Sequence, residues 1–521
     1  MMIQALLFVF LAQQPLVTTA QYDNARTGAN LKETQLTPAN VSGGHFGKQF
    51  ILPVDGDVTA EPLFVPKLTI PGKGVHDVVF IATGHDSIYA FDAAGKPADP
   101  LWHLSLIDPA KGVDTVRAQA AQCSFLSPEI GIASTPVIDA AAGTMYLIAR
   151  TAERGADGKP RYFQRLHSID ILTGSERPGS PVLIRASISG SSYFGLAKRE
   201  VTFHALLENQ RAALLLDRGT IYAAWSSSCD VGPYYGWVLA YDARSLKQTG
   251  VFNASPDATE SGIWQSGAGM AADSSGAVYT VTGNGKFTAS SANGRDYGDS
   301  VLKLSFVNDA LTVRDFFTPS NEFRLNWSDD DLGSTGPVLL PDQPGPHPHL
   351  LAAAGKAGVI YLIDRDRMGK FQSGSDRHAI QTITSPGGVY GAPAYWNGHV
   401  YYFASDDVLK DFALKDGRLS AQPVHSGTFK FGNPGAIPSI SADGAKNGIV
   451  WVVLTKAWNA NDGTAVLQAY DAADVGRLLY STANNAKDGL GRAIRLTIPM
   501  VANGRVYVAT RNGVYVYGLP D

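Results

Sequence analysis

The chain alternates between short apolar runs and polar, Gly-rich breaks along most of its length. The runs recur in sets of four: an apolar run that often contains Pro, a β-branched and aromatic run, a third run that ends in Asp, and a weaker fourth run. Such runs between turn residues predict β-strands, and each set predicts one four-stranded antiparallel blade. The first set is TAEPLFVP (residues 59–66), DVVFIAT (77–83), SIYAFD (87–92) and LWHLSL (101–106).

The third run of each set is the easiest to recognise, and counting these runs gives seven complete sets and one incomplete set. After RLHSID (165–170) in the second set, these are WVLAYD (237–242), SVLKLS (300–305), VIYLID (359–364), LKDFAL (409–414) and VLQAYD (466–471). The eighth set, within residues 497–519, lacks a fourth run. KQFILPV (residues 48–54) lies before the first set and is expected to supply that strand, which closes the ring.

The sequence therefore predicts an all-β fold: an eight-bladed β-propeller of four-stranded antiparallel blades whose last blade is closed by the N-terminal strand. Residues 46–521 form this single propeller, and residues 21–45 form an N-terminal extension. We expect residues 46–54 to contribute more to the ring than the preceding residues 21–45. A set of β-sandwiches is the alternative, but no linker-like composition separates the repeats.

The first twenty residues predict export. An apolar run at residues 5–12 (ALLFVFLA) precedes Thr18, Thr19 and Ala20, which resemble a small-residue cleavage site. This pattern predicts a signal peptide over residues 1–20 and a periplasmic or secreted protein, although no Lys or Arg precedes the apolar run. No later stretch is long enough for a transmembrane segment.

Charge and cysteine content limit the possible partners. The chain has 43 basic and 47 acidic residues without a Lys/Arg cluster, so nucleic acid is not an expected partner. Cys123 and Cys229 fit neither a zinc nor a Cys-x-x-Cys spacing. In a propeller, Cys123 before blade 2 and Cys229 between the second and third strands of blade 3 share one face, here called the top face. This favours a disulfide, with two unpaired thiols as the alternative.

Consecutive blades place polar residues on the top face. Asp230 lies in WSSSCDVGPYYGWVLAYD, Asn284 in YTVTGNGKF, Asp331 in SDDDLGSTGPVLL, and Lys356 in AGKAGVIYLIDR. Carboxylate and amide oxygens are the ligands that calcium prefers. The alternative for each is a turn or solvated loop residue. Other top-face candidates, for which a polar channel lining is the alternative, are Glu129, Tyr390 and Arg495.

In these repeats and in this order of polar residues, the chain resembles the quinoprotein dehydrogenase superfamily. Eight-bladed members of that family hold pyrroloquinoline quinone (PQQ) and calcium above the channel. The resemblance implies that Asp230, Asn284 and Asp331 bind calcium, that Asp331 is also the catalytic base, and that Asn284 and Lys356 contact PQQ. It covers most of the chain, whereas the site resemblance rests on these few positions.

Two features depart from the family pattern. The family's adjacent-cysteine pair is absent, and Gly84 and His85 stand in the corresponding loop. Trp264, in GIWQSGAG, is the candidate that stacks under the quinone, although counting back from Asn284 puts Ala268 at that position.

The resemblance implies an exported oxidoreductase that acts on an alcohol or sugar-like small molecule and passes electrons to a separate acceptor. The alternative is a non-catalytic propeller that serves as an extracytoplasmic binding or assembly scaffold for envelope proteins. A glycan-cleaving propeller is a further alternative, for which no paired-carboxylate pattern argues.

Overall fold

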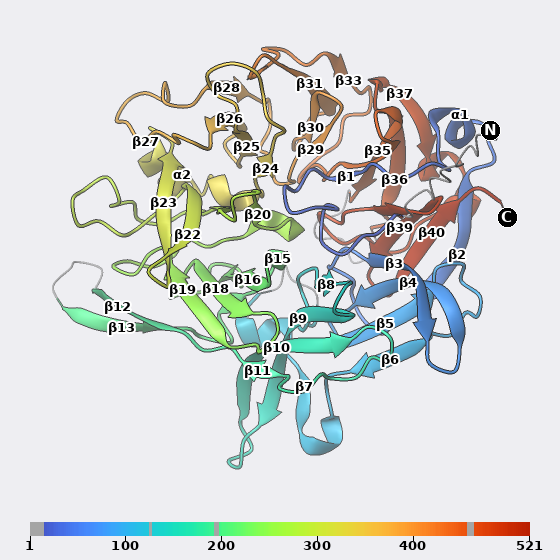
Figure 1. Ribbon diagram of the computed structural model, residues 1–521, viewed down its shortest axis with the longest axis horizontal. Helices are drawn as coiled ribbons and strands as arrows, with labels where there is room; N and C mark the ends of the chain where they lie inside the picture. The colour runs from blue at the N-terminus through green and yellow to red at the C-terminus, as the bar shows by residue number, and fades with distance from the viewer. Residues whose placement is uncertain (1–14, 124–127, 192–196, 456–462, 521) are drawn as a thin grey trace, which may run out of the picture.

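The computed structural model describes residues 15–123, 128–191, 197–455 and 463–520. Its chain runs once around a ring of blades, and residues 47–53 lie beside residues 513–518 in the last blade (Figure 1). Within these residues, eight sheets of four or five strands form the ring. The expected fold class, an all-β eight-bladed propeller, is confirmed.

The first four blades follow the chain in order. From the axis outward, blade 1 contains β3 (Leu63–Ile70), β4 (Gly74–Ala82), β5 (Ser87–Asp92) and β6 (Trp102–Ser105), and blade 2 contains β8 (Val137–Asp139), β9 (Thr144–Arg154), β10 (Pro160–Asp170) and β11 (Val182–Leu183). Blade 3 contains β15 (Leu215–Asp217), β16 (Thr220–Ala224), β18 (Trp237–Asp242) and β19 (Gln248–Asn253), and blade 4 contains β20 (Ala271–Ala272), β21 (Val278–Val281), β22 (Val301–Val307) and β23 (Ala310–Thr318).

The other four blades complete the ring. Blade 5 contains β24 (Val338–Leu339), β25 (Leu350–Ala354), β26 (Val359–Asp364) and β28 (Gln381–Thr384), and blade 6 contains β29 (Ala394–Trp396), β30 (His399–Phe403) and β31 (Leu409–Lys415), with β32 (Arg418–Leu419) and β33 (His425–Ser426) outermost. Blade 7 contains β34 (Ser439–Asp443), β35 (Lys446–Leu454), β36 (Val466–Asp471) and β37 (Asp474–Ser481), and blade 8 contains β38 (Met500–Ala502), β39 (Arg505–Thr510), β40 (Gly513–Gly518) and β2 (Gly47–Pro53).

Short elements decorate the blades. The additional strands are β1 (Ala29–Asn30) beside β34, β7 (Val113–Thr115) beside β9, the hairpin β12 (Ser187–Ser191) and β13 (Lys198–Thr202), the pair β14 (Glu208–Asn209) and β17 (Ser226–Ser227), and β27 (Lys370–Phe371) beside β23. The helices among the described residues are α1 (Pro38–Ser42) and α2 (Glu322–Ser328), with 3-10 turns η1 (Pro109–Lys111), η2 (Ala118–Ala121), η3 (Gln265–Gly267), η4 (Leu332–Ser334), η5 (Thr482–Asn484) and η6 (Ala486–Asp488).

The apolar third strands are continuous because both of their faces are buried between blades. In β36, Leu467 and Ala469 pack in a cluster with blade 8, whereas Tyr470 packs in a cluster with blade 6. The Asp that ends each such strand caps the following turn: Asp92 accepts the amide of Ala94 at 2.7 Å. Strands β5, β18, β26 and β36 accordingly have the bounds that the sequence predicts.

The expected closure of the ring is present. β2 pairs antiparallel with β40, with Ile51 opposite Tyr515. The innermost strands are shorter than the sequence predicts: β8 begins at Val137 and β38 at Met500. The residues before them form the channel mouth described below.

Residues 17–30, called the N-terminal belt here, run along the innermost strands (dark blue near β1 in Figure 1). Val17 and Phe64 of blade 1 exchange two backbone hydrogen bonds of 2.8 Å, and the Ile138 amide of blade 2 donates to the Thr18 carbonyl at 2.8 Å. Later belt carbonyls accept amides of successive blades: Asn24 from Ala272 of blade 4, Ala25 from Leu339 of blade 5, Thr27 from Tyr395 of blade 6, and Gly28 from Ile440 of blade 7.

Belt side chains contact the two remaining blades. The Asn24 amide donates to the Leu216 carbonyl of blade 3 at 2.9 Å. In blade 8, the Val501 amide donates to the Tyr22 hydroxyl at 2.8 Å, and the Asn30 amide donates to the Val501 carbonyl at 2.8 Å. The belt therefore hydrogen-bonds to every blade, whereas β2 bonds within blade 8. The expectation that residues 46–54 contribute more to the ring than the residues before them stays a prediction.

The predicted leader boundary after Ala20 falls inside the belt. Val17 and Ala20 have no exposed surface. Residues 1–14, which include the apolar run, lie outside the described residues. The leader over residues 1–20 stays a prediction, and cleavage after Ala20 would remove the belt's backbone bonds to blades 1 and 2.

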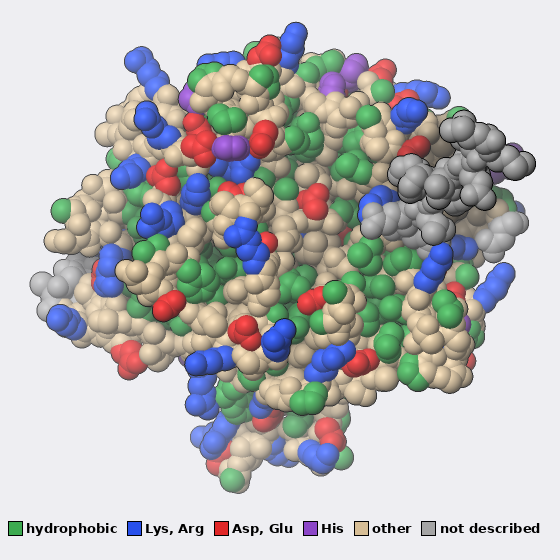
Figure 2. Space-filling model, viewed as in Figure 1, with side chains coloured by type: hydrophobic (Ala, Val, Ile, Leu, Met, Phe, Trp, Pro, Cys, Tyr) green, Lys and Arg blue, Asp and Glu red, His purple; other side chains and the backbone are tan. Residues whose placement is uncertain are grey.

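The surface carries mixed charge. On the face shown in Figure 2, acidic and basic side chains are interspersed around the ring. No helix among the described residues is long and apolar enough to cross a bilayer.

Arg26 provides a test of the belt. Its buried guanidinium donates to Thr19 Oγ1 and the Ala20 carbonyl at 2.7 Å, to the Met270 carbonyl at 2.8 Å, and to the Leu214 carbonyl at 3.2 Å. We expect Arg26→Met to lower the free energy of unfolding by about 3 kcal/mol, because buried acceptors lose a charged donor. Urea unfolding measures this loss. The exposed Arg244→Met is the control, and equal midpoints for both variants would contradict a structural role of the belt.

Glu61 makes the same region sensitive to pH. It is 4% exposed, and its Oε2 accepts the Gln21 amide at 2.9 Å. Burial raises the pKa of Glu61 from 4.5 to about 8, against the lowering effect of the Gln21 amide and the Arg26 charge. Because the folded state holds this proton more tightly than the unfolded chain, Glu61 stabilises the fold at low pH, and the contribution is lost between about pH 4.5 and 8.

We expect Glu61→Gln to flatten this pH dependence. Melting temperatures should be measured from pH 5 to 8.5 for wild type, Glu61→Gln and the exposed control Glu200→Gln. Wild type and the control should lose stability relative to Glu61→Gln as the pH rises. Parallel profiles for all three proteins would show that Glu61 does not bind its proton more tightly in the folded state.

Candidate functional site

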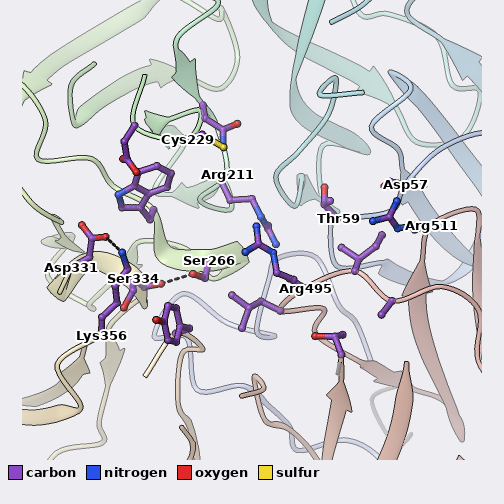
Figure 3. A pocket seen from close by; sticks show the side chains of 18 residues that line it. Asp57, Thr59, Arg211, Cys229, Ser266, Asp331, Ser334, Lys356, Arg495 and Arg511 are labelled. Atoms are coloured by element: carbon purple, nitrogen blue, oxygen red, sulfur yellow. Dashed lines mark hydrogen bonds and ion pairs between the residues drawn. The ribbon is translucent and has the colours of Figure 1, made fainter. Parts of the chain in front are cut away.

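A cavity of about 300 Å³ lies at the channel mouth on the top face (Figure 3). Its lining comes from segments that precede innermost strands and from loops between second and third strands. The lining residues used below are Arg211, Cys229, Asp230, Trp264, Asp331, Lys356, Tyr390, Arg495 and Arg511. In several blades, a residue that lines the cavity is followed a few positions later by a residue that bonds to the belt. In blade 5, for example, Ser334 lines the cavity and the Leu339 amide bonds to the belt. The belt therefore lies beyond the cavity along the channel.

Asp331, Asn284 and Lys356 are brought together at one side of the cavity. Asp331 is 6% exposed. Its Oδ1 accepts the Asn284 backbone amide at 2.7 Å, and its Oδ2 lies 2.6 Å from Lys356 Nζ. Asp329 Oδ1 accepts the Asn284 side-chain amide at 2.8 Å and Lys356 Nζ at 3.0 Å. Asp330 does not line the cavity among the described residues.

Two glycines allow this approach. A Cβ at Gly283 would lie 2.2 Å from Asp331 Oδ1, and a Cβ at Gly355 would lie 2.6 Å from the Asp331 carbonyl. The glycine of Thr282-Gly283-Asn284 is therefore required because the Asp331 carboxylate packs directly on the backbone.

The protonation of this pair depends on burial and on charge. Burial raises the pKa of Asp331, while the Lys356 ammonium and the Asn284 amide lower it. Burial alone would lower the pKa of Lys356, but the Asp331 and Asp329 carboxylates outweigh it and raise that pKa. The two carboxylates thus keep Lys356 charged.

Asp230 lies on the cavity wall in an acidic surrounding. It has a left-handed backbone (φ 55°), and its carboxylate accepts the Ser227 hydroxyl at 3.1 Å. Burial, followed by the negative charges of Asp230 and Asp331, raises the pKa of Glu260. Glu260 was not a sequence candidate, since an acidic residue in a polar loop carries no pattern of its own.

Trp264 lines the cavity, whereas Ala268 is buried against Gly336. The indole meets Tyr234 edge-on, with ring centroids 6.3 Å apart. The next two residues, Gln265 and Ser266, have left-handed φ values of 48° and 42°. This irregular turn places the tryptophan at the cavity four residues before the position that counting along the chain selects.

The top face also holds a disulfide. The Cys123 and Cys229 sulfurs are bonded, with Cα atoms 5.4 Å apart, and Cys229 lines the cavity. The bond joins blades 2 and 3 at the channel mouth.

The oxygen donors suit a hard cation only in part. Asn284 Oδ1 is buried without a hydrogen-bond partner, which leaves one acceptor available. Its neighbours are carboxylates, the ligand chemistry of calcium. However, Lys356 already binds Asp331, and no three His, Cys, Asp or Glu side chains within the described residues form a metal-ligand group.

The other side of the cavity carries arginines. Tyr390 and Arg495, two candidates from the sequence, line the cavity. Arg211 and Arg511 also line it, although the sequence analysis does not single them out (Figure 3). Glu129 lies outside the cavity lining, where His85 and Arg117 pair with it at 2.5 and 2.6 Å.

The disulfide allows a stability test. Its sequence separation of 106 residues corresponds to a stabilisation of about 5 kcal/mol in the chain-entropy account. We expect Cys123→Ser/Cys229→Ser to melt at the temperature of wild type treated with dithiothreitol, and both to melt below untreated wild type. The reductant should not affect the double variant. An unchanged wild-type melting temperature after complete reduction would contradict the stabilisation.

Comparison with solved structures finds the same architecture. A europium-containing methanol dehydrogenase is 12% identical, with 97% of this chain and 98% of that chain covered and a TM-score of 0.63. Quinohemoprotein alcohol dehydrogenases from Pseudomonas putida and Comamonas testosteroni are 15% and 16% identical, with 97% and 98% of this chain covered, 80% and 81% of theirs, and TM-scores of 0.56. No family model and no curated protein matches the sequence. At these identities, the likeness shows the fold alone.

Proposed function

We propose that the protein is an exported, quinoprotein-like oxidoreductase that binds PQQ and a hard cation in the top-face cavity and oxidises an alcohol or sugar-like small molecule. The observation that carries the proposal is the buried Asp331 beside Lys356 in the cavity at the channel mouth. A cavity of about 300 Å³ is in the size range of small-molecule sites.

The lining suits a flat, anionic cofactor. Trp264 offers an aromatic surface, and Lys356 offers a cation. PQQ, when bound, supplies the ortho-quinone that accepts a hydride. Lys356 would orient it through a quinone or carboxylate oxygen, while the Cys229 disulfide would bound the cavity on another side.

The acidic side provides the base. Burial raises the pKa of Asp331, which makes its carboxylate a stronger proton acceptor than an exposed aspartate. Asp331 would accept the hydroxyl proton of the substrate. Asp230, Asn284 and Asp331 would hold the cation, for which Asn284 Oδ1 is the acceptor without another partner.

The disulfide supports export. Disulfides persist in oxidising compartments and are rare in the cytosol. The Cys123–Cys229 bond therefore agrees with the predicted leader in favouring a periplasmic or secreted location.

The proposal predicts calcium-dependent PQQ binding to the full-length protein, measured by calorimetry, and dye-linked oxidation of alcohols or sugars. Asn284→Ala should weaken retention of calcium and PQQ. Asp331→Asn should lower turnover a hundredfold or more, the usual range for a general base. Asp330→Asn is the matched control and should behave as wild type. Absence of saturable PQQ binding would reject the oxidoreductase, and equal effects of all three variants would reject the assigned roles.

A non-catalytic scaffold for envelope proteins is the second candidate. The specific observation in its favour is that Lys356 and the Asn284 amide already occupy the Asp331 oxygens. In that case, Asp331 would have a structural role, as its bond to the Asn284 amide joins blade 5 to blade 4 at the channel mouth.

A further inference from the structure

Arg211 presents a positive charge to the cavity. The guanidinium packs on the backbone, since a Cβ at Gly267 would lie 2.5 Å from Arg211 Nη2. Its hydrogen-bond acceptor is the Ala133 carbonyl at 3.4 Å. Within the described residues, no carboxylate forms an ion pair with Arg211.

Arg495 brings a second positive charge to the same place. It comes from the segment before β38 of blade 8, whereas Arg211 comes from the segment before β15 of blade 3. Figure 3 shows the two side chains reaching toward one another across the middle of the cavity. Burial lowers the pKa of Arg211 to about 10. Burial, followed by the charge of Arg211, lowers the pKa of Arg495 to about 9.

Two adjacent guanidinium groups on a partly dehydrated wall repel one another. An anion between them would remove this repulsion and accept hydrogen bonds from both. A carboxylate matches the planar fork of a guanidinium.

We propose that Arg211 and Arg495 form a carboxylate clamp, and that the cavity binds a small molecule carrying a carboxylate. The opposite side of the cavity selects the rest of the ligand. Asp230 and Asp331 place carboxylates there, and these accept hydrogen bonds from hydroxyl groups. A carboxylate at one end and hydroxyl groups at the other describe a polyhydroxy acid.

This inference narrows the substrate class of the proposed function to acids. It rests on the proposed function only in that a hydroxyl group of the ligand is the group that reacts. PQQ also carries carboxylates and is the other source of the same chemistry. The clamp itself requires binding and no turnover, so the two proposals can fail separately.

The test is calorimetric titration of the full-length protein, without added PQQ or calcium, with gluconate and with sorbitol, its uncharged counterpart. A third titration uses PQQ with calcium. The variants are Arg211→Met and Arg495→Met, with Arg211→Lys as the conservative variant and the exposed Arg477→Met as the matched control outside the cavity. Thermal unfolding of each variant verifies that the ring is intact.

We expect gluconate to bind at least tenfold more tightly than sorbitol. Each methionine variant should lose at least tenfold in gluconate affinity, Arg211→Lys should retain part of it, and Arg477→Met should match wild type. Loss of PQQ affinity alone in the two methionine variants would also support the clamp and would assign it to the cofactor. Equal binding of gluconate and sorbitol, or methionine variants that bind gluconate and PQQ as wild type does, would overturn it. Gluconate binding without PQQ binding would reject the proposed oxidoreductase and leave the clamp intact.

Discussion

The ring depends on the hydrogen bonds that the N-terminal belt makes to its innermost strands. β8, β24 and β38 have only two or three residues each, so few ladder bonds hold them to their blades. A strand edge without a partner frays or pairs with another chain. The belt bonds each blade in turn, and Arg26 joins blades 3 and 4 to it through carbonyl oxygens. The position of the cavity follows, because its lining residues directly precede the strands that the belt holds.

Much of this fold could be predicted from the sequence, because strands buried on two faces are apolar throughout. β18 and β36 have their predicted bounds for this reason. The belt could not be predicted, because its polar residues find their partners only in the finished ring. Asn30 and Val501, for example, are 471 residues apart. Its sequence has no alternation that distinguishes it from a loop.

The site was predictable where a residue lies at a fixed position before or after a strand. Asn284, Asp331 and Lys356 could be named on that basis, and the close packing at Gly283 explains why they meet. Arg211 was not a sequence candidate, although it precedes an innermost strand as Arg495 does. Charge is therefore distributed unevenly around the cavity: Asp331 lies with Lys356 on one side, and Arg211, Arg495 and Arg511 lie on the other, where Asp57 is beside Arg511. That polarity would orient a ligand with unlike ends.

The contacts of the belt also impose an order in time. During synthesis, residues 17–30 emerge long before Val501, which is 471 residues from its partner Asn30. A nascent chain with seven finished blades still lacks both the belt's last bonds and the partner of β2. Contacts between such distant residues form slowly and leave apolar edges exposed in the meantime. The ring can therefore close only after blade 8 has been synthesised, because the joint needs strands from both sides of the chain.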